Sequence, residues 1–131
     1  QKGQTITDGD KVYTPDMVLG GARRGLKVSY CTDTRPVPAI AEYAKDADLM
    51  ICEGMYGEAD KQQKAREHKH MTMQEAAKLA SEAKPKELWL THYSPSLNYP
   101  EEYMAEIRKI FPAAKAAKDG WTMELVFPEE A

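Results

Sequence analysis

Three short apolar runs, each closed by an ionisable residue, constrain this sequence more than any other feature. The runs cover residues 26–31, 49–53 and 87–91, and they lead to Asp33, Glu53 and His92. Short runs rich in β-branched, aromatic and other apolar residues are typical of strands. If the strands are parallel, their carboxyl ends share one edge of a sheet, where layered α/β folds place their chemistry. We therefore expect Asp33, Glu53 and His92 to lie along a common edge.

Helix patterns separate these strands. Pro38 suits the first turn of a helix that runs to about residue 45, because proline fits the first helical position. Thr72 and Glu75 have the spacing of a capping box, which predicts a helix from there to about residue 83. Strand and helix thus alternate along the chain, and this order predicts an α/β fold.

The remaining segments give weaker expectations. Residues 1–10 are polar and show no obvious strand partner, so the chain looks as if it begins inside a longer protein. Residues 11–14 predict a short strand. Residues 55–69 are rich in charge and predict a mobile loop or a loosely held helix. A last helix is expected over 100–111, and residues 121–126 predict a final strand.

Composition excludes some classes of protein. The chain has 131 residues, enough for one domain with a core, and a formal net charge of −3. This charge argues against a uniformly basic surface for nucleic acid, although Arg23, Arg24 and Lys27 form a local basic cluster. No segment resembles a membrane span or a signal peptide. Cys31 and Cys52 are too few for a secreted disulfide scaffold, so we expect a reducing, cytoplasmic compartment.

The chemistry of the strand ends leaves alternatives open. Asp33 is placed to bind a metal or act as a base, and equally to cap the next helix. His92 alone suggests a structural role, but as a third ionisable group at a third strand end it favours a site. His70, just before the helix cap, suits either a catalyst or a donor that stabilises its loop. Two metal ligands, Asp33 and His92, do not make a zinc site, and His68 adds no recognised chelate spacing.

Four segments together carry a family resemblance: residues 27–36, 48–54, 68–80 and 87–94. Their order and spacing resemble ribonuclease Z, the tRNA 3′-processing endonucleases of the metallo-β-lactamase superfamily. The resemblance covers almost the whole chain and matches the C-terminal portion of the family. It implies that residues 1–131 are the C-terminal half of a metallo-β-lactamase αββα sandwich, a mixed sheet with outer helices.

The resemblance also implies roles. In the family, the Asp of the Asp-Thr-Arg-Pro segment bridges two zinc ions, which implies Asp33. The His of the Thr-His-Tyr-Ser segment binds the second zinc ion, which implies His92. A Glu–His relay is thought to help protonate the leaving oxygen, which implies Glu53 and His70. Cys52 stands where the relay segment of the family has another His, but the Glu and the His of the relay are retained.

The larger departure is the absence of the family's His-x-His-x-Asp-His motif, which supplies most zinc ligands, and of the arm that grips tRNA. For the full-length protein, the resemblance implies a zinc-dependent endoribonuclease that removes 3′ trailers from precursor tRNA by two-metal phosphodiester hydrolysis. This chain alone should then be inactive. Arg23, Arg24 and Arg35 are candidate phosphate contacts. For Arg35, an ion pair that holds its loop is the favoured alternative.

Two other functions and one assembly state remain to be tested. The protein could be a different phosphodiesterase or hydrolase of the metallo-β-lactamase fold, because Asp33 and His92 would serve any of them. It could also be a non-catalytic α/β module whose acids and histidines are caps and surface groups. Without the upstream half, one face of the sheet should be exposed, and large exposed apolar patches drive association. We therefore expect a homodimer.

Overall fold

The polar opening of the chain forms a hairpin. In the computed structural model, which describes residues 2–128, β1 (Ile6–Asp8) pairs antiparallel with β2 (Lys11–Tyr13) through a two-residue turn. Gly9 enters this turn at φ 61°, a conformation that glycine adopts at little cost. The 3-10 turn η1 (Pro15–Met17) follows. The expectation that residues 1–10 lack a strand partner was therefore wrong for β1, while residue 1 lies outside the described residues.

The chain divides into two compact units, and the candidate site lies in the second. Of the described residues, the first unit comprises 2–25 together with 127 and 128, and the second is Leu26–Val126. In the second unit, four parallel strands follow the order β3 (Val28–Cys31), β4 (Leu49–Glu53), β5 (Leu88–Thr91) and β6 (Ala114–Ala116). The three strands predicted around residues 26–31, 49–53 and 87–91 are confirmed. The expectation of one domain over residues 1–131 stays a prediction.

The final strand was predicted in the wrong place. Residues 121–126 form no strand, and β6 occupies the fourth position of the sheet instead. β6 is short and contains two alanines, which are weak strand formers, so its residues do not predict a strand. The apolar residues of 121–126 pack against the sheet instead. Trp121 packs edge-to-face on Trp89 with ring centroids 5.3 Å apart, and Met123 packs against Leu49, Trp89 and Ala117.

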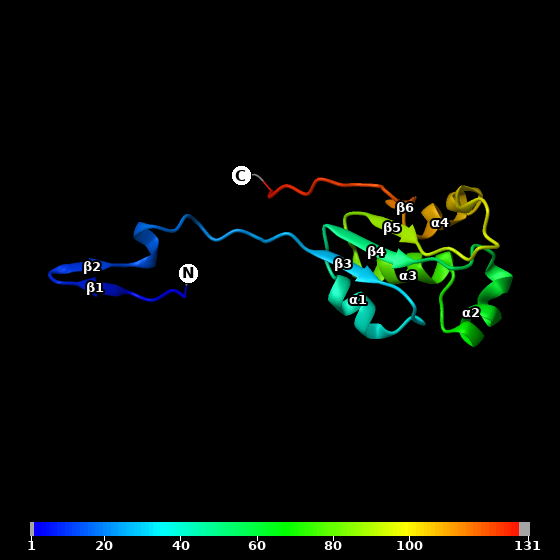
Figure 1. Ribbon diagram of the computed structural model, residues 1–131, viewed down its shortest axis with the longest axis horizontal. Coiled ribbons are helices and arrows are strands. Elements are labelled where there is room, and N and C mark those ends of the chain that lie inside the picture. The colour runs from blue at the N-terminus through cyan, green and yellow to red at the C-terminus, as the bar shows by residue number, and fades with distance from the viewer. Residues whose placement is uncertain (1, 129–131) are drawn as a thin grey trace. The chain divides into compact units, whose positions relative to one another are not determined.

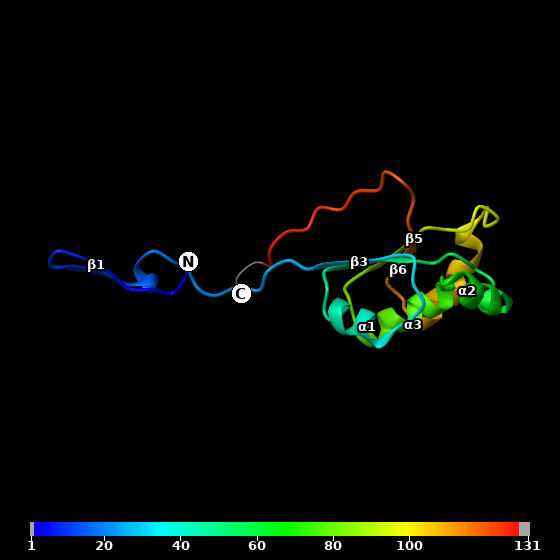
Figure 2. The ribbon, with the colours of Figure 1, turned by 60° about the horizontal axis from the view of Figure 1, so that its bottom comes forward.

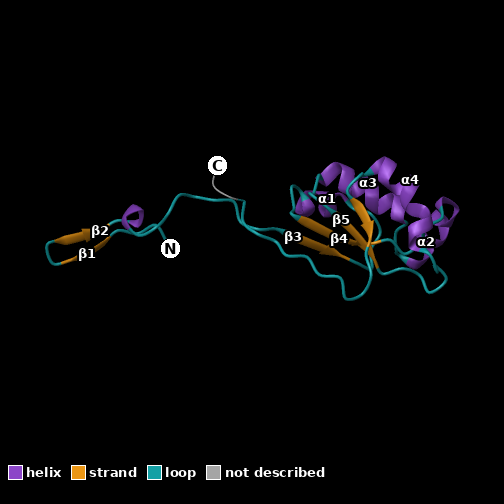
Figure 3. Ribbon diagram, turned by 90° about the horizontal axis from the view of Figure 1, so that it is seen from above, coloured by secondary structure: helices purple, strands orange, loops and turns teal. Residues whose placement is uncertain are grey.

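Helices cover one face of the sheet. Figure 3 shows α1 (Pro38–Ala44), α3 (Met73–Ala83) and α4 (Met104–Ile110) on the same side of the strands, and Figures 1 and 2 show the same layering from other directions. The largest buried side chains of this layer come from both the sheet and the helices: Met50, Leu88, Leu90, Met73, Met104 and Ile107. The two-layer packing of helix on sheet confirms the α/β class.

The local signals for the helices were accurate. Thr72 accepts a hydrogen bond from the backbone N–H of Glu75, and the Glu75 side chain returns to the Thr72 backbone, which completes the predicted capping box of α3. Pro38 opens α1 as predicted. The predicted last helix is the 3-10 turn η3 (Pro100–Tyr103) followed by α4.

Residues 55–69 are more ordered than a loop. They contain the 3-10 turn η2 (Ala59–Lys61) and α2 (Gln62–His68), which buries the side chain of Ala65 completely. Lys69 ends α2 in a left-handed conformation at φ 59°. None of the helices within residues 2–128 is long and apolar enough to cross a membrane.

The opposite face of the sheet is covered unevenly. Residues 121–126 help to bury Leu49 and Trp89. At the edge strand β3, by contrast, Val28 is 53% exposed and Tyr30 is 71% exposed. The predicted exposed apolar face is thus found on β3 rather than across the whole sheet.

Candidate active site

Asp33 and His92 face each other across the carboxyl edge of the sheet. The distance from His92 Nε2 to Asp33 Oδ1 is 3.6 Å, although neighbouring strand β4 separates β3 from β5. Both residues adopt left-handed backbone conformations, with φ 54° for Asp33 and 56° for His92. Such conformations are uncommon outside glycine and concentrate where structure is held for function. The strand ends therefore aim a carboxylate and an imidazole at one point.

Glu53 is the buried member of the group. Its side chain has no exposed surface, yet three N–H groups reach its carboxylate. The backbone N–H of Thr34 donates to Oε1 over 2.8 Å, and the backbone N–H of Met71 donates to Oε2 over 3.2 Å. A buried charge is tolerated only when donors compensate for lost water. The loops after β3 and before α3 supply these donors.

His70 approaches this edge from the loop before α3. Its Nδ1 lies 3.0 Å from Glu53 Oε2 and 3.8 Å from Asp33 Oδ1. An ionised carboxylate only accepts hydrogen bonds, so Nδ1–H is the donor to Glu53. The ring is edge-to-face with His92 at a centroid distance of 5.6 Å. This arrangement fixes the tautomer of His70 and leaves Nε2 as the nitrogen that can exchange a proton with a substrate.

A second layer of contacts holds the His70 loop. Arg35 donates to the backbone carbonyl of His70 over 2.6 Å and forms an ion pair with Glu75 at 2.6 Å. Burial alone would raise the pKa of Glu75, but the hydrogen bonds from Arg35 and the Thr72 backbone outweigh it and lower the pKa below its usual value. The ion-pair interpretation of Arg35 is confirmed. Its guanidinium is already bound to Glu75 and to the backbone carbonyl of His70.

The other candidate residues lie apart from this group. Arg23 belongs to the first unit, where its guanidinium stacks on the Phe127 ring at 3.9 Å from the centroid. A phosphate contact for Arg23 or Arg24 stays a prediction. His68 is an exposed residue at the end of α2. Among the described residues, no contact joins His68 to Asp33, Glu53 or His92.

Asp33 and His92 are residue types that bind metal ions, but two protein ligands are too few for a complete metal site. A carboxylate oxygen and an imidazole nitrogen are ordinary zinc ligands, and Asp33 and His92 bring one of each together. Within residues 2–128, however, no group of three or more His, Cys, Asp or Glu side chains is arranged to hold a metal ion. Asp33 and His92 therefore form part of a metal site at most.

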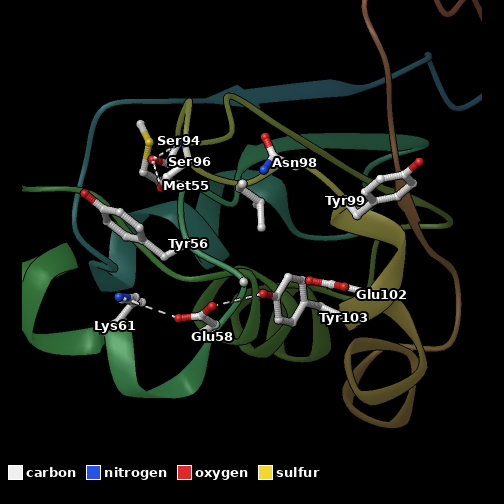
Figure 4. Close-up of a pocket in the computed structure, with 12 residues that line it drawn as sticks. Met55, Tyr56, Glu58, Lys61, Ser94, Ser96, Asn98, Tyr99, Glu102 and Tyr103 are labelled. Carbon is white, nitrogen blue, oxygen red and sulfur yellow. Dashed lines mark hydrogen bonds and ion pairs between the residues drawn. The ribbon is translucent and has the colours of Figure 1, made fainter.

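Sequence reasoning missed a pocket whose lining begins two residues after Glu53 and two residues after His92. This tyrosine pocket has a volume of about 290 Å³, and Figure 4 shows the side chains that surround it. It is lined by three tyrosines together with mainly polar residues: Tyr56, Tyr99, Tyr103, Met55, Gly57, Glu58, Lys61, Ser94, Ser96, Leu97, Asn98 and Glu102. The lining comes from separate stretches of chain, so only the unusual density of tyrosines in these loops could have suggested it.

Comparison with known proteins identifies the class. The family model described as "Beta-lactamase superfamily domain" matches residues 12–93. The chain belongs to the beta-lactamase superfamily. Its α/β architecture agrees with a crystal structure of a metallo-beta-lactamase fold protein from Bacillus subtilis, with TM-score 0.64 and 26% identity over 89% of this chain and 41% of that one.

Within the superfamily, the similarity is to ribonuclease Z. The chain is 61% identical over 130 residues to Ribonuclease Z of Lachnospira eligens, covering 99% of this chain and 43% of that protein. The crystal structure of the short form of human tRNase Z matches with TM-score 0.51 and 30% identity, covering 66% of this chain and 31% of that one. The resemblance inferred from sequence is confirmed. The chain spans about two fifths of the length of the curated relatives it matches.

Proposed function

We propose that the full-length protein containing this chain is an endoribonuclease that removes 3′ trailers from precursor tRNA by zinc-dependent, two-metal phosphodiester hydrolysis. The similarity to ribonuclease Z over nearly the whole chain supports the substrate. The observation that carries the proposal is the contact of 3.0 Å between His70 Nδ1 and the buried Glu53, placed beside Asp33. An imidazole that a carboxylate orients at a strand edge is the arrangement that a general acid requires.

Each residue has a defined task in this proposal. Asp33 and His92 would hold metal, and residues outside this chain would complete its coordination. When bound, two metal ions lower the pKa of water and stabilise negative charge on the phosphate in the transition state. Glu53 holds the His70 ring in place through Nδ1. His70 then donates a proton from Nε2 to the 3′ oxygen as its bond to phosphorus breaks.

We also propose a homodimer in a reducing, cytoplasmic compartment. Val28 and Tyr30 expose apolar surface on β3, which supports association through this face. The free thiols of Cys31 and Cys52 fit a reducing compartment. Sedimentation of this chain without the upstream half tests the first point, and a monomer at all concentrations would contradict it.

Cleavage of precursor tRNA by the full-length protein tests the function. Asp33→Ala and His70→Ala should each lower the cleavage rate by roughly a hundredfold or more, the range expected for losing a metal ligand or a general acid. His68→Ala is the matched control, because this exposed histidine lies outside the group, and it should cleave normally. Thermal unfolding should show all three variants folded. Wild-type cleavage by Asp33→Ala or His70→Ala would refute the assignment.

Two alternatives are separated by further measurements. The match to a metallo-beta-lactamase fold protein at a higher TM-score than the tRNase keeps another hydrolase of this fold in consideration. Faster turnover of a simple aryl phosphodiester than of precursor tRNA would favour that alternative. Metal analysis addresses the non-catalytic module. A two-metal hydrolase should carry about two zinc ions per chain, and a module should carry none.

A further inference from the structure

The tyrosine pocket begins where the strands of the candidate site end. Met55, at one wall, lies two residues after Glu53, and Ser94, at another, lies two residues after His92. The backbone N–H of Ser94 donates to the Met55 carbonyl over 2.8 Å, so the two walls are tied together. Two residues of chain span at most about 7 Å, so a ligand in this pocket would lie close to the candidate site.

The pocket is built in advance of any ligand. A Cβ atom on Gly57 would overlap the ring of Tyr103, so this ring lies directly against the backbone of Gly57. The side chain of Gln74, in α3, donates to the Gly57 carbonyl over 2.6 Å, and the Tyr103 hydroxyl donates to Glu58 over 3.3 Å. These contacts fix the pocket to the helical layer, so binding would not require the loops to be ordered first.

The lining favours a flat, uncharged, hydrogen-bonding ligand. Figure 4 shows Tyr56 and Tyr99 on opposite sides of the view, with Tyr103 between them. The Tyr99 side chain is 73% exposed, so a face of its ring is free for stacking. Glu58 and Glu102 bring negative charge, and Lys61 is already paired with Glu58 at 3.6 Å. The negative charge of these carboxylates disfavours a phosphate group, and their oxygens can accept hydrogen bonds from amino groups.

We propose that the tyrosine pocket binds an unpaired nucleobase of the RNA substrate, adjacent to the cleaved bond. Tyr99 stacks on the base, and Glu58 or Glu102 accepts a hydrogen bond from its amino group. Proteins that read single-stranded RNA recognise splayed bases in this way, with aromatic rings and polar groups at the base edge. The inference rests on the proposed function and adds the part of the substrate that this pocket contacts.

The test uses the full-length enzyme with three tyrosine variants. Tyr99→Ala removes the stacking ring, and Tyr99→Phe keeps it. Tyr43→Ala is the matched control, because Tyr43 lies on α1 outside the pocket and is 75% exposed. The substrates are precursor tRNA, the same RNA with an abasic residue on either side of the cleaved bond, and bis(4-nitrophenyl) phosphate, which reports phosphodiester hydrolysis alone.

We expect Tyr99→Ala to lose about tenfold in kcat/KM with precursor tRNA, the usual effect of removing one base–aromatic stack. Tyr99→Phe and Tyr43→Ala should cleave the RNA as the wild type does. With one of the abasic RNAs, wild type and Tyr99→Ala should have equal kcat/KM, and that RNA identifies the bound nucleotide.

The test distinguishes failure of the pocket proposal from failure of the proposed function. If the wild type cleaves precursor tRNA and Tyr99→Ala matches it, the pocket proposal is overturned while the proposed function stands. A loss in Tyr99→Ala that persists on both abasic RNAs would also overturn it. If the wild type hydrolyses the aryl diester but leaves precursor tRNA intact, the proposed function fails and the pocket proposal fails with it.

Discussion

Arg35 and Glu75 form a two-pronged ion pair that joins the loop after β3 to the first turn of α3. The guanidinium donates to the two carboxylate oxygens over 2.9 and 2.6 Å. Arg35 also reaches the backbone carbonyl of His70, and Glu75 caps the helix at Thr72. The Arg35–Glu75 ion pair therefore holds the segment that carries His70 at two points, the His70 carbonyl and the start of α3. Parallel hydrogen bonds of this kind set geometry as well as contributing energy.

We predict that Arg35→Lys weakens both stability and cleavage. Lysine keeps the charge but cannot make the fork to Glu75 and the bond to the His70 carbonyl together. The free energy of unfolding of the full-length protein should fall by about 1–2 kcal/mol, the value of charged hydrogen bonds. The kcat for precursor tRNA should fall by roughly tenfold or more, because small displacements of a catalytic group are costly. Denaturant unfolding and steady-state kinetics measure the two effects.

Arg66→Lys is the control for this substitution. Arg66 lies exposed on α2, and exchanges at exposed positions usually change stability by less than about 0.5 kcal/mol. An unchanged kcat in Arg35→Lys, alongside lower stability, would show that Arg35 supports the fold without positioning His70.

A second prediction concerns pH. The folded-state pKa of Glu75 lies below its usual value, so its ionised form stabilises the fold above the unfolded-state pKa, about 4.3. This contribution is lost as pH falls through the lower, folded-state pKa. Glu75→Gln should therefore be about 1–2 kcal/mol less stable than wild type at pH 7. The difference should shrink as the pH is lowered below 4.3.

Urea unfolding from pH 7 downwards measures this difference. Glu106→Gln is the matched control, because Glu106 is also paired on a helix, with Lys109 at 2.8 Å, but its side chain is 70% exposed. Exposed pairs contribute little, so this control should stay within about 0.5 kcal/mol of wild type at each pH. A difference for Glu75→Gln that stays constant with pH would contradict the role of its charge.

Local sequence patterns predicted the parts of the fold that local physics determines. The continuous apolar run at residues 49–53 specifies a strand buried on both faces, and Thr72 with Glu75 specifies a helix start. Both predictions were confirmed because each signal is contained in a short stretch of sequence, even though the pairing partners of residues 49–53 lie in the distant strands β3 and β5. Strand β6 had no such signal, since two alanines and a lysine acquire strand structure only by pairing with β5.

The candidate site was likewise predicted only where local sequence patterns were sufficient. Placing Asp33, Glu53 and His92 at one edge needed only parallel strands and their carboxyl ends. The roles assigned to these residues and to His70 stay predictions. The burial of Glu53 depends on N–H donors from two distant loops, which residue identities do not reveal. The tyrosine pocket is likewise assembled from segments that meet only in the folded chain.

The burial of Glu53 leads to a third prediction. In Glu53→Gln, one oxygen becomes an NH₂ group that faces N–H donors from Thr34, Met71 or His70. A buried donor left without an acceptor costs about 1–3 kcal/mol, so stability should fall by that amount. His70 would also lose the carboxylate that orients its ring at Nδ1, and cleavage should slow by roughly a hundredfold.

Glu42→Gln is the control for the loss of charge, because Glu42 lies exposed on α1. Unfolding and precursor tRNA cleavage should both resemble those of the wild type. If Glu53→Gln also cleaved at the wild-type rate, the pairing of Glu53 with His70 would be structural, and the proton relay would have to be abandoned.

The last prediction tests the close approach of Tyr103 to Gly57. A methyl group at residue 57 would overlap the Tyr103 ring, so Gly57→Ala should destabilise the protein by about 1–3 kcal/mol through overpacking. Gly20→Ala is the control, because a Cβ there meets nothing within 4 Å, and its stability should change by less than about 1 kcal/mol. Removing the ring in Gly57→Ala/Tyr103→Ala should relieve the overlap. The double variant should then be less destabilised than the sum of the single variants, and additive losses would show that the ring and the glycine are not in contact.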